Sequence, residues 1–212
     1  NAAGKAQIVE EDCISCGICH KACPYHAIIY VPVPCEEACP VGAIRKNEKG
    51  VEEIDEEKCI MCGRCINACP FGGIFEISQV VDVLNHINQG GQLTAMVAPA
   101  IAGQYDVSPG QVINAVREIG FTHIMEVAEG AAMTAKQESE EFHERLEAGC
   151  SLMTTSCCPS YIEAVNKHVP ALKKLVSETP SPMKFTAQLA RERFSDAKTV
   201  FIGPCVAKRK EA

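Results

Sequence analysis

The sequence predicts two parts of different fold class: an α+β domain at residues 1–77, followed by an α/β domain at residues 78–212. Three observations support this division. Ten of the 14 cysteines lie between Cys13 and Cys69. The first part repeats a short proline-containing motif, whereas the second alternates strand-like and helical patterns. A hydrophobic content of 47% over 212 residues is enough to form a folded core.

The first part contains an internal repeat in which cysteine and proline precede a small apolar run. Cys-Pro-Tyr-His-Ala-Ile begins at Cys23, Cys-Pro-Val-Gly-Ala-Ile begins at Cys39, and Cys-Pro-Phe-Gly-Gly-Ile begins at Cys69. Repetition of this kind is typical of a duplicated supersecondary unit. We therefore expect the three motifs to adopt the same local structure.

Two longer cysteine arrays share one spacing, with two, two and three residues between four cysteines and a proline after the last. Two-cluster ferredoxins have this spacing, and their fourth cysteine ligates the other [4Fe–4S] cluster. The first part is thus predicted to be a ferredoxin-like two-cluster domain. Zinc is disfavoured, because zinc sites usually pair two shorter Cys-x2-Cys units. The predicted ligands of two [4Fe–4S] clusters are Cys13, Cys16, Cys19 and Cys69 for one, and Cys59, Cys62, Cys65 and Cys23 for the other.

The repeat at Cys39 leaves the crossing ligand open. Cys35 and Cys39 form the second half of an array whose first two cysteines are absent. Nineteen residues lie between Cys39 and Cys59, against thirty-five between Cys23 and Cys59. The shorter connection would allow Cys39 to replace Cys23. We favour Cys23 and interpret the stretch from Pro24 to Cys39 as an insertion; in the alternative, Cys35 and Cys39 are buried free thiols.

The second part is expected to form a parallel sheet. Its strands are predicted at 93–98, 121–127, 151–155 and 199–203, and its helices at 78–89, 109–119, 131–148, from 159 onward and at 182–194. The helix at 109–119 has Ser108 as N-cap and Gly120 as its stop signal. Ligands of such sheets bind beyond the carboxyl ends of the strands. Cys157, Cys158 and Cys205 each follow a predicted strand, so we expect them at that edge.

Two motifs in the second part carry a family resemblance. Residues 155–159 read Thr-Ser-Cys-Cys-Pro, and residues 204–211 contain Pro-Cys-x2-Lys-x2-Glu. Together they resemble the first two active-site signatures of [FeFe]-hydrogenases. Similarity extends to Ala98-Pro99-Ala100, and cysteine arrays in the first part are also typical of that family. The second part therefore resembles part of the hydrogenase catalytic lobe.

The resemblance implies the H-cluster, a [4Fe–4S] cube joined through a cysteine to a diiron site with CO, CN⁻ and a bridging azadithiolate. Cys158 and Cys205 match two of its cysteine ligands, and Cys157 matches the residue that exchanges protons with the bridging amine. The family's proton path and cyanide-binding lysine match Glu138, Glu141 and Lys208. The residues that match the lining of the diiron pocket are Pro99, Ala100 and Pro204.

The spacing of two acidic residues agrees with this proton path. Glu138 and Glu141 are three positions apart on one face of the predicted helix, which suits a carboxylate relay. The alternative is a solvated acidic face, because Glu140, Glu144 and Glu147 lie nearby.

The sequence departs from the family pattern in several places. Gly203 stands where the family usually has methionine, and Ser160 and Tyr161 stand where it usually has glycine and tryptophan. We expect these residues to change the tuning of the diiron pocket. The third signature, which supplies two further H-cluster cysteines, is absent from the sequence given. We therefore expect a missing C-terminal segment or a completing chain. Cys150 matches no residue of the family pattern.

The resulting hypothesis is an [FeFe]-hydrogenase that reversibly reduces protons with electrons from ferredoxin or a similar partner and is assembled by hydrogenase maturation factors. The alternatives are an electron-transfer iron–sulfur protein and a hydrogenase-like sensory or iron–sulfur assembly protein. The 20 basic and 27 acidic residues form no basic stripe, which disfavours nucleic acid. No apolar run approaches about 20 residues, so we expect no membrane span. Thiolate ligands must stay reduced, which favours a cytoplasmic location.

Overall fold

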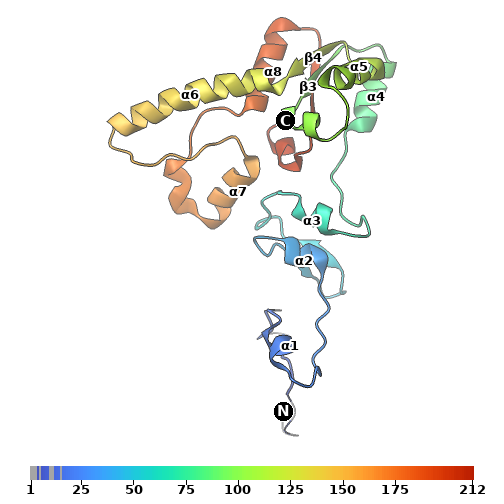
Figure 1. Ribbon diagram of the computed structural model, residues 1–212, viewed down its shortest axis with the longest axis vertical. Coiled ribbons are helices and arrows are strands. Elements are labelled where there is room, and N and C mark those ends of the chain that lie inside the picture. The colour runs from blue at the N-terminus through green and yellow to red at the C-terminus, as the bar shows by residue number, and fades with distance from the viewer. Residues whose placement is uncertain (1–3, 5, 10–11, 15) are drawn as a thin grey trace.

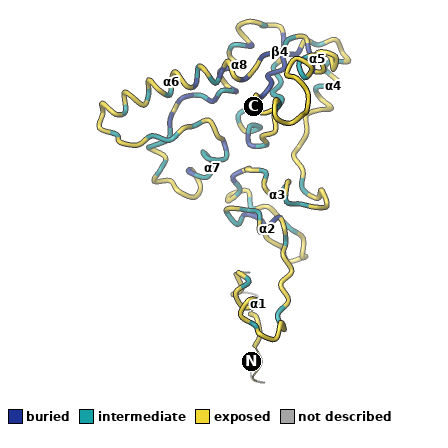
Figure 2. The backbone as a smooth tube through the Cα atoms, in the orientation of Figure 1, coloured by how far each residue is buried: buried dark blue, intermediate teal, exposed yellow. Residues whose placement is uncertain are grey.

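The computed structural model describes residues 4, 6–9, 12–14 and 16–212. A sheet surrounded by helices forms the second part of the chain, and the cysteine-rich first part extends away from it (Figure 1). Buried residues are concentrated in and around the sheet, whereas most of the first part is exposed (Figure 2). Among the described residues, no helix has the length and apolar character that crossing a membrane requires.

A three-stranded parallel sheet lies at the centre of the second part, as the alternating pattern predicts. Strand β3 (Leu93–Val97) pairs with β4 (His123–Glu126) on one side and with β5 (Lys198–Ile202) on the other. All five residues of β3 are buried, which is typical of a middle strand covered on both faces.

Alternate residues of β3 pack into two separate cores. On one face, Leu93, Ala95 and Val97 contact residues from α4 (Val80–Asn88) and α5 (Pro109–Ile119). On the other face, Met96 packs with residues from α6 (Val127–Glu147) and α8 (Pro182–Arg193). The two-residue period of the strand therefore fixes which helices cover which face.

Helix α5 begins and ends as the sequence predicts. The Ser108 hydroxyl accepts a hydrogen bond from the Gln111 amide, and the Gln111 side chain accepts one from the Ser108 amide at 2.9 Å. This capping box satisfies two amides that the first turn leaves unpaired. Gly120 ends the helix with a φ of 118°, in the left-handed region that favours glycine.

Helix α6 begins at Val127, four residues before the predicted start. The helix therefore contains Gly130, which lies where α6 crosses α8. A side chain at this position would overlap the carbonyl oxygen of Pro182 and the hydroxyl of Thr186. Close packing of the two helices therefore explains the glycine, which lies inside α6 and does not mark where the helix begins.

The prediction of a strand at 151–155 is wrong. Among the described residues, this segment forms only an isolated parallel bridge between Thr154 and Val176. The Thr154 amide donates to the Leu175 carbonyl, and the Ser177 amide donates to the Thr154 carbonyl, both at 2.8 Å. The segment thus pairs briefly with the chain that leaves a 3₁₀ helix, η3 (Pro170–Leu175), and does not join the central sheet.

The described residues of the first part form three short α-helices and one antiparallel hairpin. Helix α2 (Pro34–Ala38) packs against α3 (Arg64–Ala68), and strands β1 (Ile44–Lys46) and β2 (Glu52–Ile54) pair between them in the sequence. Helix α1 (Ile18–Ala22) lies in a separate lobe, apart from the α2–α3 pair (Figure 1).

Candidate functional site

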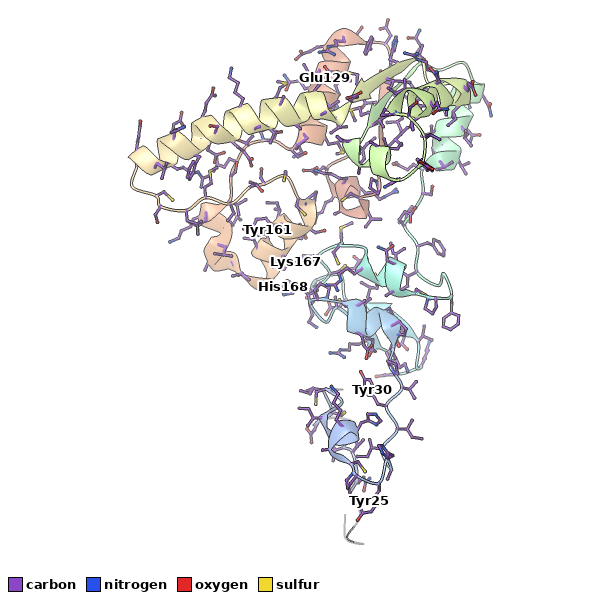
Figure 3. All side chains as sticks on the ribbon, in the orientation of Figure 1. Tyr25, Tyr30, Glu129, Tyr161, Lys167 and His168 are labelled. Carbon is purple, nitrogen blue, oxygen red and sulfur yellow. The ribbon has the colours of Figure 1, made fainter. Side chains whose placement is uncertain are left out.

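The paired cysteines of the first motif lie just before a helix. Cys157 and Cys158 are both exposed, and α7 (Pro159–His168) begins directly after them, as predicted. The Tyr161 hydroxyl, labelled in Figure 3, donates a 2.7 Å hydrogen bond to the Thr154 hydroxyl. Tyrosine at this position therefore joins α7 to the segment that precedes the cysteines. A tryptophan there would have no hydroxyl to make this bond.

Lys208 connects the two motifs in space. Its Nζ atom donates a 2.8 Å hydrogen bond to the carbonyl of Cys157 and forms a 2.7 Å ion pair with Glu211. Glu211 also accepts a 2.9 Å hydrogen bond from the Ser181 hydroxyl. Lys208 lies on the 3₁₀ helix η4 (Val206–Lys210), directly after Cys205. The lysine therefore holds the Cys157 backbone beside the segment that carries Cys205.

The carboxyl edge of the sheet carries four further residues of the predicted site. Strands β3 and β5 end side by side, and the amide of Ala98 donates a 2.9 Å hydrogen bond to the carbonyl of Ile202. The prediction that Cys205 follows a strand at this edge is confirmed. Cys157 and Cys158 instead follow the irregular segment at 151–156. The residues of the predicted site that lie exposed beyond the ends of β3 and β5 are Pro99, Ala100, Pro204 and Cys205.

Gly203 stands where no side chain fits. A Cβ atom at this position would lie 2.6 Å from the ring of Phe201 and 3.0 Å from the Cβ of Ala98. The methionine that the resemblance leads us to expect would therefore require Phe201 to move. The glycine at position 203 is therefore explained by the ring of Phe201, which occupies the space that a side chain at position 203 would need.

The carboxylate of Glu141 accepts three hydrogen bonds and forms one ion pair. Its carboxylate accepts hydrogen bonds from the hydroxyls of Ser177 and Thr179 at 2.6 and 2.8 Å and from the amide of Glu178 at 3.0 Å. Arg145, one helical turn away, lies 2.6 Å from the same carboxylate. The sequence did not reveal the partners at Ser177, Glu178 and Thr179, because groups 36 to 38 positions away form no recognisable motif. Only the arginine was detectable, at helical i,i+4 spacing.

These partners hold Glu141 in its charged form. Burial raises the pKa of Glu141, but the hydrogen bonds from Ser177, Glu178 and Thr179 and the charge of Arg145 outweigh it and lower the pKa to about 2. Near neutral pH, Glu141 is therefore a fixed acceptor that orients the hydroxyl of Ser177.

Glu138 lies on the same face of α6 as Glu141. It is half-buried and accepts a 3.3 Å hydrogen bond from the amide of Ser156, next to Cys157. The Ser156 hydroxyl in turn donates to the Thr179 carbonyl at 2.5 Å. In contrast, Glu140 and Glu144 are exposed. The two inward carboxylates therefore differ from the solvated acidic face that was the alternative.

The three Cys-Pro motifs of the first part share one local geometry, as their repetition predicts. Each sulfur accepts a hydrogen bond from the amide four residues later: at 3.4 Å for Cys23, 3.1 Å for Cys39 and 3.2 Å for Cys69. Backbone amides lower the pKa of Cys23 and of Cys69. Amides directed at sulfur favour the thiolate, which is the form that ligates metal.

The fold places Cys23 apart from Cys39 and Cys69, which end the packed helices α2 and α3. Cys23 ends α1 in the separate lobe, whereas Cys39 ends α2, which packs against α3. Cys65 lies within α3, and burial, together with the neighbouring Cys59 and Cys62 thiolates, raises its pKa.

A hollow of about 580 Å³ lies beside the α2–α3 pair and is lined in part by Cys35 and Cys69. Cys35 is buried, and the nearby Cys69 thiolate contributes to a raised Cys35 pKa, after burial and the charge of Glu52. Both carboxylate oxygens of Glu52, which also lines the hollow, are buried, and burial together with the neighbouring Glu36 carboxylate raises the pKa of Glu52. The hollow therefore combines two thiols with a carboxylate in an apolar setting.

The described residues contain no group of three or more His, Cys, Asp or Glu arranged around a single metal ion. A [4Fe–4S] cube instead spreads its thiolates around its corners. The ten cysteines of the first part provide the donor chemistry that such cubes take, and backbone amides are directed at the sulfurs of Cys23, Cys39, Cys59 and Cys69.

Comparison with protein families assigns both parts of the chain. Residues 91–212 match the family described as iron only hydrogenase large subunit, C-terminal domain. Residues 29–80 match the LdpA Fe-S cluster-binding domain, and residues 6–29 match the 4Fe-4S binding domain.

Individual relatives agree with the family match. The chain is 31% identical over 112 residues to iron hydrogenase 1 of Clostridium pasteurianum, covering 49% of this chain and 20% of the relative. It is 30% identical over 143 residues to the periplasmic [Fe] hydrogenase large subunit of Nitratidesulfovibrio vulgaris, covering 57% and 34%. The chain thus spans a fifth to a third of the length of these relatives.

Solved structures show the same likeness. The fold matches an apo [FeFe]-hydrogenase from Chlamydomonas reinhardtii with a TM-score of 0.56 and 29% identity, over 64% of this chain and 40% of that one. A second [FeFe]-hydrogenase, studied for oxygen inactivation of its 2Fe subcluster, matches with a TM-score of 0.57 and 28% identity, over 64% and 41%.

The depressed pKa of Glu141 predicts a specific dependence of stability on pH. A carboxyl that titrates at about 2 when folded and at its ordinary 4.5 when unfolded stabilises the fold above pH 4.5. That contribution, on the order of 3 kcal/mol, disappears as the pH falls from about 4.5 to 2. We expect Glu141→Gln to lower the free energy of unfolding by about this amount at pH 7 and to have little effect near pH 2.

Urea denaturation at several pH values measures this difference. Glu144→Gln on the exposed face of α6 is the matched control, and its effect should stay within about 0.5 kcal/mol. A cost of Glu141→Gln that is equal at pH 7 and pH 2, or equal to that of Glu144→Gln, would contradict the assignment.

Proposed function

The chain belongs to the family of the iron-only hydrogenase large subunit, and on that premise we propose that it takes part in the reversible reduction of protons to H2. The observation that carries this proposal is the 2.8 Å hydrogen bond from Lys208 to the carbonyl of Cys157. This bond joins the two motifs that resemble the family's active-site signatures, although 51 positions separate the residues. An electron-transfer protein would need neither motif.

We assign the cysteines beside this bond to the H-cluster. When bound, the H-cluster supplies the metal centre at which electrons and protons combine. Cys158 and Cys205 are its proposed ligands from this chain; both are exposed, and the hydrogen bond from Lys208 to Cys157 links the segments that carry them. Pro99, Ala100 and Pro204 lie beyond the ends of β3 and β5, where they would line the diiron pocket. The Lys208 ammonium would offset the negative charge of a cyanide ligand.

Proton transfer is assigned to Cys157 and the two inward carboxylates. The thiol of Cys157 lies 3.7 Å from the Thr155 hydroxyl, and the neighbouring amide of Ser156 donates to Glu138. Glu138 is the proposed proton carrier on α6. Glu141, whose low pKa disfavours protonation, serves the path by orienting the hydroxyl of Ser177.

Electrons are proposed to arrive from ferredoxin or a similar donor through [4Fe–4S] clusters in the first part. Cys13, Cys16 and Cys19 provide three proposed ligands of one cluster. The crossing rule for such arrays gives Cys69 as the fourth, although Cys69 ends α3 and lies outside the lobe that contains α1. A second cluster takes Cys59, Cys62 and Cys65 together with either Cys23 or Cys39. The packing of α2 on α3 supports Cys39, because Cys23 lies in the separate lobe.

The choice between Cys23 and Cys39 can be tested in a chain that lacks the first three cysteines. With Cys13, Cys16 and Cys19 changed to Ala, the reconstituted protein should keep about four irons per chain at the second array. Adding Cys39→Ser should remove most of this iron, and adding Cys23→Ser should leave it. Iron and acid-labile sulfide analyses measure both. The reverse pattern would assign the position to Cys23.

The proton-transfer role predicts the effect of Cys157→Ser. In the matured protein, together with the segment or chain that supplies the two further H-cluster cysteines, this variant should lose at least 100-fold in hydrogen evolution, because a hydroxyl holds its proton far more tightly than a thiol. Iron content should not change, since Cys157 is not a proposed ligand. Cys150→Ser is the matched control and should keep full activity, because Cys150 matches no residue of the family pattern. Unchanged turnover in Cys157→Ser would refute the role.

A further inference from the structure

Two residues at the carboxyl end of α7 hold the second cysteine array. The Nζ atom of Lys167 donates hydrogen bonds to the backbone carbonyls of Glu56 at 2.9 Å and Cys59 at 2.8 Å. The Nε2 atom of His168 lies 2.8 Å from the carbonyl of Lys58, to which it must donate because a carbonyl only accepts. Figure 3 labels both residues where α7 meets the first part of the chain.

The carbonyls that they bind belong to one rigid turn. The carboxylate of Asp55 accepts the amides of Glu57 and Lys58, and its carbonyl accepts the amide of Cys59 at 2.8 Å. The amides of the turn are therefore bound within it. Lys167 and His168 donate hydrogen bonds to three of its carbonyls from outside. These bonds join the turn to α7 and give the backbone carbonyls of the turn the donors that they require.

The ammonium of Lys167 has no freedom to turn elsewhere. Its third partner is Glu163, one helical turn earlier on α7, at 3.1 Å. Glu163 is 9% exposed and forms a second ion pair, of 2.7 Å, with Lys210 of η4. All three donors of the ammonium are used, so its positive charge is fixed at the backbone of Cys59.

A second contact joins the same array to the motif that contains Cys205. Gly63 begins α3 with a φ of 76°, and a Cβ atom there would lie 2.7 Å from the side chain of Val206. The loop between Cys62 and Cys65 thus touches the residue that follows Cys205. The array is held at two places, by α7 and by η4.

We propose that Lys167 is a positioning residue: it fixes the Cys59–Cys65 loop, and the [4Fe–4S] cluster assigned to it, against α7 and places one positive charge beside that cluster. The inference rests on the proposed function for the cluster itself. Because α7 begins directly after Cys158, one helix of about 15 Å carries a proposed H-cluster ligand at one end and this contact at the other. The helix thereby sets the separation of the two centres.

The fixed charge has a consequence for the cluster's reduction potential. A reduced cluster carries one more negative charge than an oxidised one, so a nearby ammonium stabilises the reduced form and raises the potential. Lys167→Met, which keeps the length of the side chain and removes its charge, should therefore shift the potential of one cluster to a more negative value. In Lys167→Arg the potential should stay close to that of the unaltered chain, because arginine keeps the positive charge.

A redox titration of the reconstituted full chain, followed by electron paramagnetic resonance, measures this shift. Lys174→Met is the matched control, since Lys174 is an exposed lysine that follows α7 closely in the sequence. Its potentials should equal those of the unaltered chain. Equal shifts in Lys167→Met and Lys174→Met, or no shift in Lys167→Met, would overturn the placement of the charge.

A second readout needs no cluster. Hydrogen–deuterium exchange of the amides at 57–65 should become about tenfold faster in Lys167→Met, the effect of losing about 1.4 kcal/mol of hydrogen bonding. It should not change in Lys174→Met. Unchanged exchange in Lys167→Met would overturn the positioning role. If the unaltered chain bound no iron at this array, the proposed cluster would fail, and the exchange rates alone would decide the positioning.

Discussion

The hydrogen bond from Lys208 to the carbonyl of Cys157 is the interaction on which the candidate site depends. The paired cysteines do not belong to the central sheet, so no strand pairing brings them to its carboxyl edge. Lys208 does so from η4, whose own place is set by the end of β5. Glu211 and Ser181 hold the lysine from the other side. A polar contact between two chain segments, and not strand pairing, therefore brings the paired cysteines to the sheet edge.

Helix α7 extends this organisation to the first part of the chain. Cys158 lies at its amino end, and Lys167 and His168 hold the turn before Cys59 at its carboxyl end. The buried Glu163 pairs with lysines from α7 and η4, so the same carboxylate links both contacts. The charges at this junction are paired, and hydrogen bonds from the two lysines hold the pKa of Glu163 below its ordinary value. The geometry of the junction is thus fixed by few, well-satisfied polar groups.

The sequence predicts those features that have a local cause. The capping residues of α5 are readable because Ser108 and Gln111 act within one turn, and the three Cys-Pro motifs share a geometry because they share a sequence. Glu138 and Glu141 could be placed on one face by helical spacing alone.

Features with distant causes could not be predicted. The segment 151–155 has the composition of a strand, but its partner is the chain around Val176 and the pairing ends after one bridge. Three of the groups around Glu141 come from the segment 177–179, and the contact of Lys167 with Cys59 spans 108 positions. Neither follows a period or a motif. The sequence also did not reveal that α1 lies apart from the α2–α3 pair, so it left the choice between Cys23 and Cys39 open.

Infrared spectroscopy of the matured protein tests the central claim most directly. The sample would be the chain with the segment or partner that supplies the remaining H-cluster ligands, prepared with hydrogenase maturation factors. The account predicts absorption bands from metal-bound CO and CN⁻, with CN⁻ bands that change frequency in Lys208→Met. A protein that carries its [4Fe–4S] clusters but shows no such bands after maturation would contradict it. That result would favour an iron–sulfur protein without the diiron site.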